Sequence, residues 1–454
     1  MLDTPVNAAD ATPSENTRNR GGSIAEEISK LKERDNHTNI FHIGKIYFII
    51  AATAVGTIWA WEAAFAGQLS WWIVTAITVV AIAIMGASQH NLGAVIHEGT
   101  HYLLFKNRKL NEYASDWLGG FPIYTSTHAY RLHHFAHHQF VNDPKRDPIF
   151  DQIEEGHHWL DFPVHHIELL WGVLRLLWLP NLVKYIAARA KYAAIGSEKN
   201  PFSDPERTGS PWPARFGVMF LVVLPAILGP IVAFQQFALA GAVIGISWLA
   251  ITAYYILIPE GTFPENRIKS DVSQRWTTIG RMTYGAALYA SLTWAEAATG
   301  APAWGYFALL WVLPLFTTFP VFMIFREWCQ HGNADRGRMT NTRVFLVDPL
   351  SRYAVFPLGM EYHLPHHLFA SVPHYKLKDL HELMGRNPEY AEKGRIVENW
   401  AAHAPSGNPT IIDILGPNYT PTGERAYVDE DVTEDAEIQD RDAIAQHSAQ
   451  SARG

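Results

Sequence analysis

The chain has 454 residues, of which 48% are hydrophobic and only 18% are charged, and its formal net charge is -8. A single cysteine, Cys329, excludes a disulfide framework, a cysteine-type zinc site and an iron–sulfur cluster. Residues 411–454 hold ten acidic and three basic side chains, so most of the net charge lies there, and no basic patch suggests a nucleic-acid partner.

Composition divides the chain into three parts. Residues 1–40 are polar, lack the apolar core of a cleavable signal peptide, and are predicted to form an N-terminal tail. Residues 41–403 hold the long apolar stretches and are predicted to form one integral-membrane domain. Residues 404–454 are acidic and lack apolar periodicity, so we expect them to be a disordered C-terminal tail.

The apolar stretches predict six transmembrane helices, because a hydrocarbon layer roughly 30 Å thick takes about 20 apolar residues to cross. The fifth is the weakest, since it is short and carries Glu296 near its end. The stretch Leu169–Ile186 is apolar but interrupted by Pro180 and charged residues, which predicts a helix at the membrane interface. The six predicted spans are residues 46–66, 72–94, 216–234, 238–258, 282–299 and 304–325.

The distribution of positive charge predicts the orientation of these spans. Lys and Arg are absent from residues 46–105, 216–266 and 282–325, each of which holds two spans and a short turn. The positive-inside rule therefore places both termini in the cytoplasm, as expected for a multi-pass protein of a bacterial inner membrane. If residues 282–299 were an interfacial helix instead, another segment would have to restore the even number of crossings.

Eight histidines in three short boxes are the main chemical signal. Neutral imidazole is a common metal ligand, and residues i, i+3 and i+4 of a helix share a face, so each HxxHH box is predicted to aim three rings at one point. Eight imidazoles exceed the ligands of one zinc ion and indicate two metal ions. The boxes are box 1, His97-Glu-Gly-Thr-His101, box 2, His134-Phe-Ala-His137-His138, and box 3, His363-Leu-Pro-His366-His367.

The predicted topology brings these boxes to one side of the membrane. Boxes 1 and 2 follow the second span and box 3 follows the sixth, so an even number of crossings puts all three on the cytoplasmic face. Behind box 3, an apolar stripe of Leu377, Leu380 and Leu383 is expected to pack on the metal-bearing helices.

Other histidines carry weaker signals. Four are expected at the surface, namely His157, His158, His165 and His166. His90 is expected to be an interior polar residue, and His133 is out of phase with box 2. His128 and His374 carry no spacing argument.

The sequence around boxes 2 and 3 resembles the membrane fatty-acid desaturase family. Box 2 is preceded by Tyr130-Arg131 and followed by Asp147-Pro, as in the second box of that family. Box 3, with Glu361-Tyr before it and Val372-Pro-His-Tyr375 behind it, resembles the third box. The resemblance covers roughly residues 41–395.

The resemblance implies an all-α membrane protein whose cytoplasmic helical cap carries a non-haem di-iron centre. His331, in Arg326-Glu-Trp-Cys-Gln-His331, matches a further ligand of the family, which gives nine histidines for two irons. Asp147 is the candidate that orients a ligating ring. Dioxygen would be the co-substrate. Electrons would come from a separate ferredoxin, rubredoxin or b-type cytochrome, because the chain has no fused cytochrome element.

The activity that the resemblance favours is fatty-acyl desaturation, which introduces a C=C bond into an acyl lipid. Carotenoid or other lipid hydroxylases and ketolases share similar boxes and remain the alternative. A remote alternative is a membrane zinc peptidase, because His97-Glu98-Gly-Thr-His101 is a literal HExxH motif, although that function leaves boxes 2 and 3 unexplained. A non-catalytic scaffold on the same fold is also possible, but intact boxes argue against it.

Overall fold

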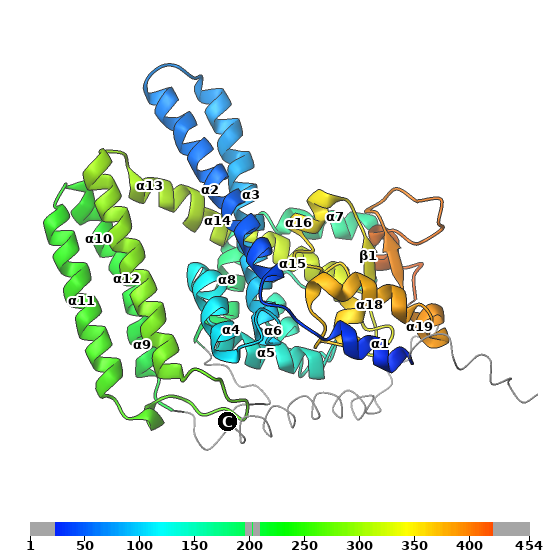
Figure 1. Ribbon diagram of the computed structural model, residues 1–454. Helices are drawn as coiled ribbons and strands as arrows, with labels where there is room; N and C mark the ends of the chain where they lie inside the picture. The colour runs from blue at the N-terminus through cyan, green and yellow to red at the C-terminus, as the bar shows by residue number, and fades with distance from the viewer. Residues whose placement is uncertain (1–22, 196–201, 203–208, 421–454) are drawn as a thin grey trace, which may run out of the picture.

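The computed structural model describes residues 23–195, 202 and 209–420. Long helices extend from one side of a compact part, in which α5, α6, α15 and α18 lie close together (Figure 1). The turns that join α2 to α3 and α12 to α13 lie at the top of the view, far from α5 and α18. The molecule therefore has an end made of long apolar helices and an end made of short ones.

Five helices in the described ranges are long and apolar enough to cross a membrane. They confirm the predicted spans, except for the fifth, as helices of suitable length and composition. Two of the five are assembled from shorter pieces in series. The five are α2 (Thr38–Phe65), α3 (Trp71–Thr100), α9–η5–α10 (Trp212–Val218, Met219–Val223, Leu224–Ala233), α11 (Phe237–Leu257) and α13–η7–α14–α15 (Ala303–Phe307, Ala308–Val312, Leu313–Phe316, Thr318–His331).

The fifth predicted span is a helix of full length but of lower hydropathy. It is α12 (Gln274–Thr299), which packs along α11. Met282 and Tyr289 lie fully buried on its inner face, and the Tyr289 hydroxyl donates a hydrogen bond to the Leu221 carbonyl at 2.7 Å. The helix is thus confirmed, and its crossing of a membrane stays a prediction.

The predicted interfacial helix over 169–186 is two helices rather than one. These are α7 (His166–Arg175) and α8 (Leu179–Ala190), which continues into η4 (Lys191–Ile195). The two segments meet at an angle of 78°. Pro180 explains the break, because proline fits the first turn of a helix but would clash within its interior.

The compact part is built of short elements. They are α1 (Ile24–Leu31), α4 (Arg108–Ser115), η2 (Asp116–Gly120), η3 (Phe121–Ile123), α5 (Thr127–Gln139), α6 (Pro148–Glu155), α16 (Pro349–Ala354), α17 (His363–Leu368), η8 (His374–Lys376), α18 (Leu377–Met384), α19 (Pro388–Lys393) and α20 (Ile411–Leu415). A further short element, η6 (Glu260–Thr262), lies in the connection from α11 to α12.

One small sheet departs from the all-α prediction. Strands β1 (Val344–Leu346) and β2 (Ile396–Glu398) pair in parallel, with Val344 opposite Ile396. The sheet ties the segment before box 3 to the segment behind it. Its three-residue strands are too short to show the alternation by which a strand is recognised in a sequence.

The stripe behind box 3 packs as predicted. Leu377, Leu380 and Leu383 of α18 are buried in one cluster with Leu364 and Leu368 of α17. This packing fixes the short helix that carries box 3, which has no side-chain cap at its start.

Both predicted tails contain folded segments, which corrects their boundaries. At the N-terminal end, α1 starts with a Ser23–Glu26 capping box and packs Ile28 against α18. At the C-terminal end, Ile411, Ile414 and Leu415 of α20 are buried against the core of β1 and α16. These three residues stand at positions i, i+3 and i+4, which lie on one face of a helix. The acidic composition of residues 404–454, taken as an average, conceals this short apolar pattern. The predicted disorder of residues 1–22 and 421–454 lies outside the described residues.

We expect Ile414→Ala to destabilise the fold by about 2–5 kcal/mol, because it empties a fully buried position. The midpoint of thermal unfolding, measured in detergent, should fall. Ile412→Ala alters a half-buried position of the same helix and should shift the midpoint much less. A chain ending at residue 410, which composition alone predicts to be intact, should be destabilised, whereas a chain ending at 420 keeps α20. Equal midpoints for these two truncations would contradict the role assigned to α20.

Candidate metal centre

The nine predicted histidines come together in two groups whose ligand nitrogens lie within 4.8 Å of one another. They arrive on four helices, α3, α5, α15 and α17. We call the groups cluster A and cluster B. Cluster A is His97, His101, His134, His138 and His366, and cluster B is His137, His331, His363 and His367.

Each HxxHH box divides its rings between the clusters, which corrects the prediction that all three share one point. His134 and His138 of box 2 belong to cluster A, whereas His137 belongs to cluster B. Box 3 does the reverse, since only His366 joins cluster A. The reason is that successive helix residues are about 100° apart around the axis, so i+3 and i+4 point to different sides of position i. One box can therefore serve two adjacent metal ions.

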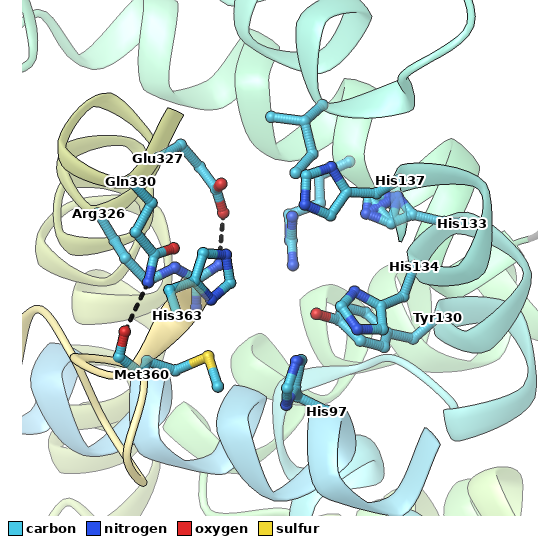
Figure 2. Close-up of a pocket in the computed structure, with 12 residues that line it drawn as sticks. His97, Tyr130, His133, His134, His137, Arg326, Glu327, Gln330, Met360 and His363 are labelled. Atoms are coloured by element: carbon cyan, nitrogen blue, oxygen red, sulfur yellow. Dashed lines mark hydrogen bonds and ion pairs between the residues drawn. The ribbon is translucent and has the colours of Figure 1, made fainter. Parts of the chain in front are cut away.

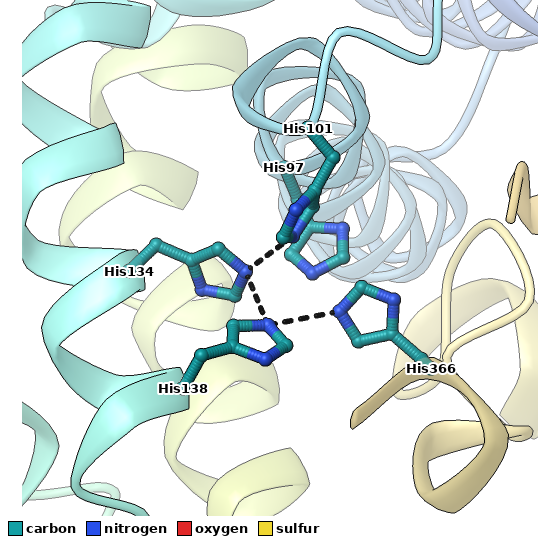
Figure 3. A group of neighbouring side chains, drawn as sticks. All are labelled: His97, His101, His134, His138 and His366. Carbon is teal, nitrogen blue, oxygen red and sulfur yellow. Dashed lines mark hydrogen bonds between the residues drawn. The ribbon is translucent and has the colours of Figure 1, made fainter. Parts of the chain in front are cut away.

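The rings of cluster A point toward one another (Figure 3), and neighbouring rings in both clusters approach through their Nε2 atoms. In cluster A, His134 Nε2 lies 2.9 Å from the Nε2 atoms of His101 and His138. In cluster B, His363 Nε2 lies 3.1 Å from that of His331 and 3.0 Å from that of His367. Two nitrogens bound at right angles, each about 2.1 Å from one ion, are roughly 3 Å apart. The spacing thus fits rings that share an ion.

The protonation of these rings also suits a metal. Burial, followed by the proximity of other imidazoles, lowers the pKa of His101, His134 and His138 well below the usual value of 6.5. The same causes lower the pKa of His363 and His366. Both nitrogens of His97 and the Nδ1 atoms of His363 and His366 are buried without a hydrogen-bond partner. Neutral rings with unpaired nitrogens are the state that binds a metal ion.

Asp147 contacts the centre as the sequence suggested. Its Oδ2 lies 2.9 Å from His137 Nδ1 and accepts a hydrogen bond from the Asn142 backbone N–H. Burial alone would lower the pKa of His137, but the charge and hydrogen bond of Asp147 raise it. Asp147 also caps α6 by accepting from the Ile149 N–H. The carboxylate therefore fixes the His137 ring and the start of the next helix together.

Two further outer contacts were not predicted. Glu98 Oε1 lies 3.5 Å from His97 Nδ1, and its Oε2 accepts a hydrogen bond from the His374 backbone N–H. His331 Nδ1 faces the Asn341 carbonyl at 3.2 Å. Glu98 was visible in the sequence only as part of an HExxH motif, and its position behind a ring argues against its use as a peptidase base.

Box 1 is held against box 2 by the Arg131 side chain. The Arg131 guanidinium is fully buried and donates hydrogen bonds to the Thr100 and Gly99 carbonyls at the end of α3. Its Nη1 pairs with Glu112 at 2.7 Å. Gly99 allows the close approach of α4, because a Cβ there would lie 2.0 Å from Ser115 Oγ. The aromatic–Arg pair before box 2 thus has a structural reason.

The remaining histidines mostly lie where they were expected. His157, His165 and His166 are exposed, and His90 is buried with its Nδ1 2.8 Å from the Ala354 carbonyl. His158 was predicted at the surface, and that is wrong, because it is 1% exposed. The backbone turns at His157, whose φ is 55°, and directs His158 toward Tyr185.

A cavity lies directly against both clusters (Figure 2). His97 and His134 of cluster A and His137 and His363 of cluster B line it. Its other lining residues are Tyr130, His133, Ile149, Arg189, Arg326, Glu327, Gln330 and Met360. Sequence reasoning missed Arg189, Arg326 and Glu327 as site residues. The available signal for Arg326 and Glu327 was a charged pair directly after the predicted span 304–325, on a helix that the structure continues to His331. Charged residues on an apolar helix of this kind are uncommon unless they serve a function.

Comparison with known proteins agrees with this centre. A model of the fatty acid desaturase family matches residues 69–265 and 251–398. The chain belongs to the fatty acid desaturase family. It is 23% identical over 424 residues to the dihydrorhizobitoxine desaturase of Bradyrhizobium elkanii, covering 90% of this chain and 94% of that protein. It is 37% identical over 70 residues to the Delta(5) fatty acid desaturase fat-4 of Caenorhabditis elegans, 15% of this chain and 16% of that protein.

Membership in the family makes the chain a desaturase-type oxidoreductase and implies a lipid substrate. It leaves the zinc-peptidase alternative without support, since box 1 meets residues of boxes 2 and 3 in one cluster.

We expect Asp147→Asn to lower metal affinity by roughly tenfold to a hundredfold, the usual cost of losing a carboxylate behind a ligating ring. Asparagine still caps a helix, so α6 should persist while the charge beside His137 is lost. Competition with a chelator measures the affinity. Asp151→Asn makes the same change at an exposed position of α6 and should retain the parent value. Equal affinities for the two variants would show that Asp147 acts only as a cap.

Proposed function

We propose that the chain is an O2-dependent, membrane-embedded di-iron enzyme that introduces a C=C bond into an acyl substrate. The observation that carries this proposal is the meeting of nine imidazoles in two adjacent clusters, with the His138 and His367 rings 4.4 Å apart between centroids. Imidazole suits iron, and ions held by two adjacent clusters could act on one substrate. Membership in the desaturase family supports the same reaction.

The overall reaction requires a strong oxidant. Two C–H bonds break, one C=C bond forms, and dioxygen is reduced to two waters with two electrons from the substrate, two from an external donor and two protons. Two bound irons would supply the means to bind and reduce dioxygen, which no side chain provides.

The residues of the chain position the histidine rings and exclude water from around them. The nine rings are buried or nearly so, and Asp147 and Glu98 stand behind His137 and His97. Neutral imidazoles add no negative charge, so bound ions would keep their full positive charge beside the cavity. The cavity reaches rings of both clusters and is where a C–H bond could approach the two metals.

We propose that α12 completes a set of six membrane-crossing helices. Large apolar side chains project from α2 and α3 without a partner, among them Phe48 at 72% and Trp72 at 85% exposure. Surfaces of this kind need a hydrocarbon environment. Trp171 of α7 and Trp178, the residue directly before α8, are exposed, which suits the interface between lipid and water. Both termini and the metal centre then lie in the cytoplasm of a bacterial cell.

We also propose a separate electron donor, a ferredoxin, a rubredoxin or a b-type cytochrome. A centre on the cytoplasmic side of the membrane would be within reach of such a donor. Hydroxylation or ketone formation at a carotenoid or another lipid remains the alternative reaction, because oxygen transfer begins with the same C–H cleavage. The desaturase names of both relatives favour the double bond.

Expression in a bacterial host should produce unsaturated products that are absent when His366→Ala is expressed. The purified parent should hold about two irons per chain and little zinc. His331→Ala should lose iron, because it removes a cluster B ligand, whereas the exposed His157→Ala should match the parent. Product analysis by mass spectrometry separates a loss of two hydrogens from a gain of oxygen. One zinc and no iron would overturn the proposal.

Cysteine accessibility in intact cells should place Ser70 and Gly300 outside and Ser270 inside. The reason is that the turns at 66–71 and 300–304 carry no Lys or Arg, whereas Lys269 adjoins Ser270. Cysteines would be introduced singly after replacing Cys329, which is buried. Labelling of Gly300→Cys from the inside would show that α12 does not cross.

A further inference from the structure

The cavity at the two clusters is polar where an acyl chain would need apolar walls. Apart from the four cluster histidines, six of its lining residues are polar or charged and only Ile149 and Met360 are apolar. Placing methylene groups against buried charges leaves those charges without water or partners, which is costly. Ligand sites use polar groups sparingly to fix orientation, so this lining indicates a polar part of the substrate beside the metals.

The residues that line the cavity carry more positive than negative charges. Arg189 from α8 and Arg326 from α15 contribute two positive charges, and Glu327 contributes one negative charge. Arg326 uses Nη2 for Glu327 and Nη1 faces His90 at 3.1 Å, but its Nε is buried with no partner. Arg189 is half-buried and donates from Nη1 to Gln152 at 3.2 Å. One positive charge is therefore left without a balancing carboxylate in the lining.

The surroundings of these groups favour an anion with defined orientation. Gln330 donates to the Met360 carbonyl at 2.9 Å, but its Oε1 is buried without a partner. The pair of arginines can therefore receive a carboxylate, and Gln330 can receive a donor group on the same molecule. A second cavity differs from the first in its lining, which includes the aromatic residues Trp117, Phe121 and Trp276. No residue lines both cavities.

We infer that the substrate carries a carboxylate close to the carbon that reacts, and that Arg189 and Arg326 bind it inside the cavity. This inference rests on the proposed function and narrows it. An acyl chain oxidised far from its carboxyl end would place only methylene groups against the arginines. The carboxylate can belong to a fatty acid that reacts near its head or to a small water-soluble acid.

Calorimetric titration of the purified, iron-loaded protein tests the inference. The probes are stearate for a lipid source, hexanoate for a simple acid and L-norleucine for an amino acid. Each is compared with its uncharged amide, octadecanamide, hexanamide or L-norleucinamide. We expect at least one acid to bind and its amide to bind much more weakly. The acid that binds most tightly identifies the source. Equal binding of acids and amides, or binding by no acid, would overturn the inference.

Variants separate the arginine site from direct binding to the metals. Arg189→Gln should weaken the binding of the preferred acid by roughly tenfold to a hundredfold, as expected for the loss of a charge-assisted hydrogen bond. Lys184→Gln makes the same change in charge at an exposed position of α8 and should bind like the parent. Arg326→Gln is the less direct variant, because it leaves Glu327 unpaired. Unchanged affinity in Arg189→Gln would overturn the inference.

Iron content, measured on the same samples, keeps this inference apart from the proposed function. Iron-loaded protein that binds no carboxylate would overturn the carboxylate site and leave the di-iron proposal standing. Protein without iron that binds a carboxylate in an Arg189-dependent manner would overturn the di-iron proposal alone.

Discussion

Nine imidazole rings that gather in two buried clusters are the constraint on which the rest of the structure depends. Such an arrangement needs support from the surrounding structure, because buried imidazoles have lost their hydrogen bonds with water. Arg131 holds the end of α3, Asp147 holds the ring of His137, and the Asn341 carbonyl faces His331. The core shared by α17 and α18 holds box 3. These contacts support histidines on each of the four helices that carry the two clusters.

The spacing and the resemblance predicted which histidines come together, but not how they are divided between two clusters. All nine were identified from HxxxH and HxxHH spacing and from a resemblance, and the long apolar spans were identified from length. The division of box 2 between two clusters depends on where box 3 arrives, more than two hundred residues later. The spacing of residues within box 2 carries no information about where box 3 lies in the folded chain. His158 was misplaced for a similar reason, because a single left-handed residue before it decides which way it points.

The average composition of a segment gave a wrong prediction where a few apolar residues of that segment pack together. Residues 404–454 are acidic overall, yet Ile411, Ile414 and Leu415 are buried in the core beside β1. The polar residues 1–40 likewise include Ile28, which packs on α18. A short amphipathic helix needs only one apolar turn to dock, so a wide window cannot detect it. The resemblance to a family had a limit of its own, because the family motifs identified the histidines of the two clusters but did not identify the other residues that line the cavity.

The charged residues that line the cavity are not explained by their contribution to the stability of the fold. Arg326 and Glu327 lie within an apolar span, and a buried ion pair of this kind is seldom more stable than apolar residues of similar size. Arg189 adds a second cation on the same cavity, with no second carboxylate in the lining to balance it. A fold selected only for packing would place apolar side chains there, next to rings that need burial. The surplus positive charge is therefore best explained by the molecule that enters the cavity. An anionic group beside the metals would balance the positive charge that the carboxylates of the lining leave unpaired.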